Sequence, residues 1–102
     1  MTMVNQEEIR AAHILVDTQA KALEIVGWLN EAPRERLHEA FAELAARNST
    51  CSTFNRGGDL GWFKRGVMHR TFEAIAFNLS IMQYNRIPVQ TPFGWHIICR
   101  IS

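Results

Sequence analysis

Two histidines lie inside apolar segments near opposite ends of the sequence. His13 interrupts the run AAHILV, and His96 interrupts the run GWHIIC. A neutral imidazole donates a hydrogen bond from one ring nitrogen and accepts one at the other. Two such rings on adjacent strands could therefore hydrogen-bond each other and form a linked polar pair inside an apolar core. Either histidine taken alone is as readily interpreted as a hydrogen-bonded core residue.

Cys51 lies in a polar loop between the two histidines and adds two further kinds of chemistry. Thiolate and imidazole groups are good zinc ligands, but no fourth ligand occurs at a recognisable spacing. A cysteine nucleophile activated by a histidine is another option, but no nucleophile motif or oxyanion loop accompanies it. Both alternatives therefore rank below a hydrogen-bonded network.

The composition excludes several classes of protein. The chain has 102 residues and 47% hydrophobic content, which suits one globular domain. Eleven basic residues against ten acidic ones give a net charge of +1, too little for non-specific nucleic-acid binding. Two cysteines are too few for a disulfide framework. No apolar run approaches the ~20 residues of a membrane span, so we expect neither a nucleic-acid nor a membrane partner.

The first twelve residues, MTMVNQEEIRAA, are polar and lack the apolar core of a signal peptide. We therefore favour a cytoplasmic location, although a module of a longer, exported protein fits the same sequence. We expect residues 1–8 to form a flexible segment ahead of a single domain at 9–102, and we expect a monomer.

Hydrophobic periodicity and turn residues predict an α+β domain with helices packed on a small sheet. The predicted elements are strands at 10–16, near Asp59 and at 94–101, helices at 18–30, 33–48 and 69–79, and an irregular link at 80–92. Side chains alternate between the two faces of a strand. Alternation puts His13 on one face with Ala11 and Leu15, and His96 on one face with Ile98 and Arg100. His38 and His69 lie in polar stretches, and we expect them to be solvated.

Five motifs occur in an order and spacing that resemble the parvulin-type peptidyl-prolyl isomerases: AAHIL, FAELA, GGDLGWF, RGVM…F…AIAF and TPFGWHII. The resemblance covers residues 10–100. It implies the parvulin (FKBP-like) fold, a four-stranded antiparallel sheet surrounded by helices. It also implies cis–trans isomerisation of X–Pro bonds in flexible or unfolded polypeptides, without a cofactor. The alternative is a chaperone module that binds proline peptides without catalysis.

The resemblance also assigns site residues to positions in this sequence. It implies a catalytic network of His13, Cys51, Thr91 and His96, and a proline pocket of Leu60, Met68, Phe72 and Phe93. In such a network Thr91 and Cys51 would complete the hydrogen bonds at the two ends of the histidine pair.

The departures from the family pattern lie around the groove. The link SIMQYNRIPV lacks the usual glycines, and Arg70 stands where a proline is common. Phosphate-selective parvulins carry a basic cluster after the first strand, where this sequence has VDTQAK with a single cation, Lys21. We therefore predict no strong preference for a phosphorylated residue before proline.

Overall fold

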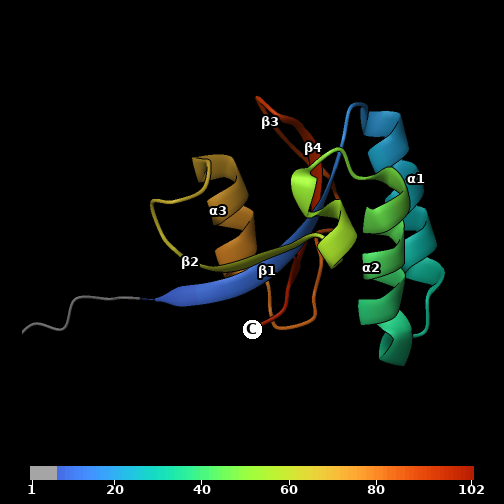
Figure 1. The fold of residues 1–102 in the computed structure, drawn as a ribbon, viewed down its shortest axis with the longest axis horizontal. Coiled ribbons are helices and arrows are strands. Elements are labelled where there is room, and N and C mark those ends of the chain that lie inside the picture. The colour runs from blue at the N-terminus through green and yellow to red at the C-terminus, as the bar shows by residue number, and fades with distance from the viewer. Residues whose placement is uncertain (1–6) are drawn as a thin grey trace, which may run out of the picture.

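The computed structural model describes residues 7–102, and the predicted α+β fold with a four-stranded antiparallel sheet is confirmed (Figure 1). The elements follow one another as β1 (Glu8–Val16), α1 (Gln19–Glu31), α2 (Leu37–Asn48), β2 (Asp59–Lys64), α3 (Arg70–Asn78), β3 (Val89–Thr91) and β4 (Gly94–Arg100). Two short 3₁₀ helices, η1 (Arg34–Arg36) and η2 (Ser52–Arg56), precede α2 and β2.

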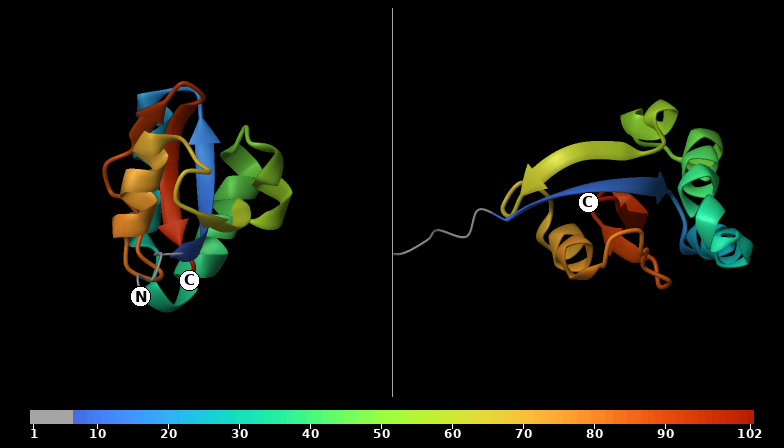
Figure 2. Two further views of the ribbon diagram at one scale, coloured as in Figure 1. Left: turned by 90° about the vertical axis from the view of Figure 1, so that its left-hand side faces the viewer. Right: turned by 90° about the horizontal axis from the view of Figure 1, so that it is seen from below.

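The sheet has the strand order β2-β1-β4-β3, with every pair antiparallel. The two central strands are therefore the first and last of the chain, and they run side by side in Figure 2. In their register His13 lies opposite Ile98, and Leu15 lies opposite His96. This register brings both histidines to the middle of the sheet.

Each face of the sheet carries its own hydrophobic core, and α3 lies on the opposite side of the strands from α1 and α2 (Figures 1 and 2). Ile14 and Ile97 pack under α1 and α2, whereas Ala11 and Ile98 pack under α3. The alternation predicted for both strands is thus confirmed. Since His13 shares the parity of Ala11, and His96 that of Ile98, both rings face the α3 side.

Two predicted boundaries were wrong. The second long helix begins at Leu37 rather than at Pro33, because Pro33 is extended (φ −58°, ψ 143°) and a 3₁₀ turn follows it. The link predicted as irregular over 80–92 contains the short edge strand β3. Pro88 immediately precedes β3, a position that proline tolerates because an edge strand can spare one N–H donor.

Side chains fix the rest of the link before β3. The side-chain Oδ1 of Asn85 accepts a hydrogen bond from the Ile98 N–H (2.6 Å), and its Nδ2 donates to the carbonyl oxygens of His96 (3.3 Å) and Ile87 (3.0 Å). Asn85 therefore stands in for ladder hydrogen bonds that a regular strand would make with β4. These bonds hold the link against β4.

Residues 1–6 of the predicted flexible segment lie outside the described residues. Glu8 already belongs to β1, where it pairs with Lys64. Within residues 7–102 no helix combines the length and apolar character that a bilayer crossing demands.

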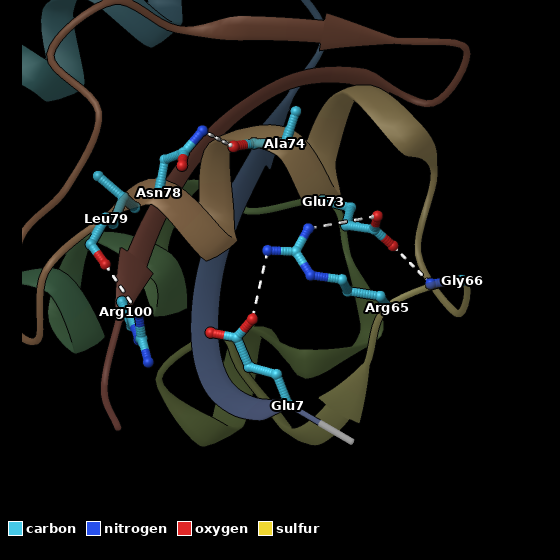
Figure 3. A network of polar contacts seen from close by, with 8 residues as sticks. All are labelled: Glu7, Arg65, Gly66, Glu73, Ala74, Asn78, Leu79 and Arg100. Carbon is cyan, nitrogen blue, oxygen red and sulfur yellow. Dashed lines mark hydrogen bonds and ion pairs between the residues drawn. The ribbon is translucent and has the colours of Figure 1, made fainter. Parts of the chain in front are cut away.

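The turn between β2 and α3 is held by the charge network of Figure 3. Arg65 bridges Glu7 (3.3 Å) and Glu73 (3.9 Å), and its guanidinium lies 4.3 Å from the centre of the Phe77 ring. Glu73 also accepts a hydrogen bond from the Gly66 N–H (2.5 Å). These contacts anchor both ends of a segment that carries three residues of the site described next.

Candidate active site

All eight site residues predicted from the sequence line one hollow of about 220 Å³ on the α3 side of the sheet. Each comes from a different part of the chain: His13 from β1, Cys51 from the start of η2, Leu60 from β2, Met68 from the β2–α3 turn, Phe72 from α3, Thr91 from β3, Phe93 from the turn after β3, and His96 from β4. Two further residues, Leu15 and His69, complete the lining.

The two histidines form a direct pair at the floor of this hollow. Their Nδ1 atoms lie 3.0 Å apart, and the rings stack at 22° with centroids 5.1 Å apart. Only 5% of His13 and 4% of His96 is exposed. At the other end of His96, Nε2 lies 2.7 Å from the hydroxyl of Thr91.

The direction of the hydrogen bonds follows from Thr91. Its Oγ1 accepts from the Phe93 N–H (3.2 Å), so its hydroxyl proton is available to His96 Nε2. His96 then carries its own proton on Nδ1 and donates it to His13 Nδ1, because a neutral imidazole has one donor and one acceptor. This assignment gives a hydrogen-bond partner to every donor and acceptor in the series from the Phe93 N–H through Thr91 and His96 to His13 Nδ1. The reverse assignment would leave the Thr91 hydroxyl proton without an acceptor.

An apolar wall rises above the histidine pair. The Phe72 ring meets both imidazoles edge to face, with centroid distances of 5.5 Å to His13 and 5.3 Å to His96. Phe72 is buried, Leu60 and Met68 are partly buried, and Phe93 is 73% exposed. The hollow therefore has a fixed aromatic back, adaptable sides and one loosely held ring at its mouth.

Comparisons with known proteins identify this arrangement. The PPIC-type PPIase (rotamase) domain matches residues 13–102. The chain belongs to this parvulin family of peptidyl-prolyl cis–trans isomerases. It is 34% identical to the peptidyl-prolyl cis-trans isomerase Pin1 of Digitalis lanata over 117 aligned positions, which cover 95% of this chain and 98% of that protein.

Longer bacterial relatives contain the same domain. A putative peptidyl-prolyl cis-trans isomerase of Helicobacter pylori is 37% identical over 95% of this chain, and the foldase PrsA of Bacillus subtilis is 42% identical over 89%. This chain spans only 33% and 29% of those proteins. Among solved structures, one of two SurA-like chaperones of Campylobacter jejuni matches with a TM-score of 0.89 and 35% identity, over 93% of this chain and 38% of that one. The parvulin NmPin of Nitrosopumilus maritimus matches with a TM-score of 0.77 and 33% identity, over 98% and 100%.

Cys51 does not complete the parvulin histidine network as we expected. Its sulfur accepts a hydrogen bond from the Thr53 hydroxyl (3.3 Å), so it is held within η2. His13 Nε2 is buried and has no hydrogen-bond partner among the described residues. The expectation that Cys51 hydrogen-bonds the His13 end of the network was therefore wrong, although Cys51 does line the hollow.

Both histidines of the parvulin site are neutral at physiological pH. Burial lowers the pKa of His13 to about 4, and the neighbouring His96 adds to this shift. Burial is also the main reason that the pKa of His96 is lowered to about 4, with a smaller contribution from His69. The pair can therefore exchange hydrogen bonds without placing a charge beneath the apolar wall.

His69 is exposed to solvent, as expected, and it also lines the parvulin hollow. It caps α3, where its Nδ1 accepts from the Thr71 N–H at 3.2 Å. A ring whose Nδ1 accepts carries its proton on Nε2, so His69 keeps a donor for other partners. Its place directly after Met68 and before an amphipathic helix is the sequence signal that could have found it.

The zinc alternative gains no support from the geometry. Within residues 7–102, no three side chains of the histidine, cysteine, aspartate or glutamate types are placed to hold a metal ion. Both Nδ1 atoms of the histidine pair are already engaged with each other.

Proposed function

We propose that this domain catalyses cis–trans exchange at X–Pro bonds in flexible or unfolded polypeptides. The observation that carries the proposal is the apolar hollow with a neutral, hydrogen-bonded histidine pair as its floor. The relatives named above are isomerases, foldases and chaperones, and acting on polypeptides is consistent with all three names.

The reaction needs no covalent intermediate. Amide resonance sets a barrier of ~18–20 kcal/mol to rotation about the C–N bond. In the twisted transition state that resonance is lost, and the carbonyl oxygen carries less negative charge than in either planar isomer. A dry, uncharged hollow therefore favours the twisted amide over the planar ones. This selective preference for the transition state is what lowers the barrier.

The proline ring would sit against Phe72, between Leu60 and Met68. Phe93 would cover its outer edge while the preceding carbonyl rotates in the open mouth of the hollow. The histidine pair would keep the floor rigid, since each ring is held at Nδ1 and His96 is also held at Nε2. In this mechanism Cys51 contributes shape and polarity and forms no covalent bond.

The test is isomerisation of a proline peptide by exchange NMR or a protease-coupled assay. Phe93→Ala is the informative variant, because a 73% exposed ring contributes little to the core and can be removed without unfolding the domain. We expect it to raise KM and lower kcat/KM by about tenfold, a loss of ~1.4 kcal/mol. Trp28→Ala, a half-exposed ring on α1, is the matched control and should leave the rate unchanged.

The rival function is a chaperone module that binds proline peptides without accelerating their exchange. It is favoured by the altered link before β3, which lacks the usual glycines of the family. Saturable binding of a proline peptide without any rate enhancement by the wild-type domain would select this rival and refute the isomerase.

We further propose that the substrate needs no phosphate before proline and that the domain acts as a monomer. Lys21, the cation after β1, pairs with Glu24 (3.1 Å) and lies 5.4 Å from the centre of the Trp28 ring, so its charge is already engaged. The eight predicted residues converge on one hollow within a single copy of the chain, so a second copy is not needed to build it. Paired peptides with leucine, glutamate or phosphoserine before proline should be turned over at rates within about threefold, because in the described residues no cation cluster follows β1 to bind the phosphate.

A further inference from the structure

A second hollow, of about 410 Å³, lies on the opposite face of the sheet, beneath α2 and η2. Its floor is apolar and includes Phe41, Cys99 and Ile101. Its rim is cationic and includes Arg10 and Arg56. A volume of this size lies within the ~300–1,000 Å³ of ordinary small-ligand sites. None of its lining residues belongs to the proline hollow.

The charges on the rim are unequally matched. Asp59, the acid in this lining, is bound by Arg10, whose Nε lies 3.2 and 3.1 Å from its two oxygens, and it also accepts from the Gly61 N–H (2.8 Å). Within residues 7–102 the Arg56 guanidinium makes no hydrogen bond or close ion pair. The charge of Arg56 acts on Asp59 only at longer range. The pKa of Asp59 is lowered mainly by its hydrogen bond with Arg10, and the charge of Arg56 lowers it further. The two arginines and one aspartate leave one positive charge uncompensated.

We propose that this second hollow binds the free C-terminal carboxylate of a polypeptide whose last residue is apolar. A guanidinium with all five N–H donors unspent is suited to gripping a carboxylate through two parallel hydrogen bonds. The apolar floor lies directly beside it and takes the last side chain. A carboxylate and an apolar side chain attached to the same carbon are what an apolar C-terminal residue presents.

The same charges argue against other ligands. A phosphate dianion would bring two negative charges next to the fixed carboxylate of Asp59, whereas one carboxylate neutralises the single excess charge. A neutral ligand would leave Arg56 as it is. An acidic side chain supplies the charge but no apolar group for Phe41 and Ile101 to cover.

The second hollow does not depend on the proline hollow for its chemistry. Ala12 lines the second hollow and His13 lines the first, and these neighbours in β1 point to opposite faces. Occupation of one hollow therefore leaves the other open, so a polypeptide end can be held while an internal proline is isomerised.

The experiment is an NMR titration of the 102-residue chain with acetyl-Ala-Ala-Leu, as the free acid and as the C-terminal amide. We expect the free acid to shift the backbone amides of Gly57, Gly58 and Asp59 saturably, and the amide to shift none of them. Arg56→Gln should weaken binding by about tenfold or more, the typical scale of a lost charge-assisted hydrogen-bond pair. The control is Arg47→Gln, which makes the same charge change outside this hollow, on an exposed arginine paired with Glu43 (3.1 Å). It should leave the affinity unchanged.

Several results would overturn the proposal. They are equal binding of the amide, shifts confined to the proline hollow, or equal losses for the two arginine variants. Acetyl-leucine tests the source of the carboxylate: if it binds as tightly as the tripeptide, the hollow serves small acids and the assignment to chain ends is wrong. The Arg56→Gln variant should isomerise an internal proline at the wild-type rate when both ends of the peptide are blocked. This readout separates failure here from failure of the proposed isomerase.

Discussion

The two hollows lie on opposite faces of the same central strands, yet their linings follow opposite rules. In the proline hollow the polar floor of His13, His96 and Thr91 is neutral, buried and linked by hydrogen bonds. In the second hollow the polar groups are charged, and Arg56 lacks a partner among the described residues. A floor of neutral side chains that hydrogen-bond one another presents little polarity to a ligand, whereas a lining with an unpaired guanidinium presents a positive charge. The difference indicates catalysis by a dry surface on one face and recognition of an anion on the other.

The largest effect is expected from Phe72→Ala, which removes the apolar back of the proline hollow. Phe72→Ala deletes a buried ring that contacts both imidazoles and Phe63, and such deletions cost about 3–5 kcal/mol of unfolding free energy. Urea unfolding measures the loss, and the isomerisation assay is then read only on the folded fraction. Phe72→Leu keeps most of the volume and should retain partial activity. Full activity in a folded Phe72→Ala variant would refute the role of the wall.

The second prediction uses acid to charge the proline hollow. His13 and His96 have pKa values lowered from 6.5 to about 4, so the folded state binds fewer protons than the unfolded state between these values. Stability is therefore complete above about pH 6.5 and falls as the pH drops towards 4. At one pH unit per 1.36 kcal/mol, the loss by pH 4.5 is on the order of 2 kcal/mol for each histidine.

Urea unfolding between pH 7.5 and pH 4.5 checks this acid sensitivity. A variant with His13→Asn should lose about half of the pH dependence, since one of the two titrating rings is gone. The variant His38→Gln is the control, because His38 lies on the rim of the second hollow and not in the buried pair. If the unfolding free energy of the His13→Asn variant depends on pH as steeply as that of the wild type, groups other than this histidine control the acid sensitivity.

The third prediction concerns the end of the hydrogen-bond chain. Thr91→Val keeps the shape of the side chain and leaves His96 Nε2 and the Phe93 N–H without their partner. An unsatisfied buried group costs about 1–3 kcal/mol, and the loosened His96 ring should also lower kcat. Thr71→Val is the control, at an equally β-branched position on the first turn of α3. Equal unfolding free energies for the two variants would contradict the proposed chain.

The sequence predicted those parts of the site that regular strands control. Alternation with a period of two fixes the face of His13 and His96 once their strands are found, and the central pairing then follows from the family resemblance. The apolar wall was also predictable, because Phe72 repeats with the core face of α3. The positions of these residues depend on local periodicity, which a sequence displays directly.

The remaining features depend on how distant segments pack. The partner of Cys51 is set by η2, whose course is determined by packing on α2 and β2. β3 was missed because three residues are too few to display a period. The second hollow has no motif, since Arg10, His38 and Arg56 come from separate segments and meet only in the folded chain.

The smallest effect is expected from Cys51→Asp, which tests whether the site requires a thiol at this position. Its sulfur accepts one hydrogen bond, from the Thr53 hydroxyl, and makes none to either histidine. An aspartate carboxylate is also an acceptor of hydroxyl donors, so Cys51→Asp should keep the loop in place and retain activity within about threefold, or ~0.7 kcal/mol in barrier height. Thr53→Val, which removes the donor of the same bond, is the companion variant and should cost a similar amount. Complete loss of isomerisation in a folded Cys51→Asp domain would mean that the thiol acts directly on the substrate. The proline hollow would then contain a reactive group, and the contrast between a neutral catalytic face and a charged binding face would be wrong.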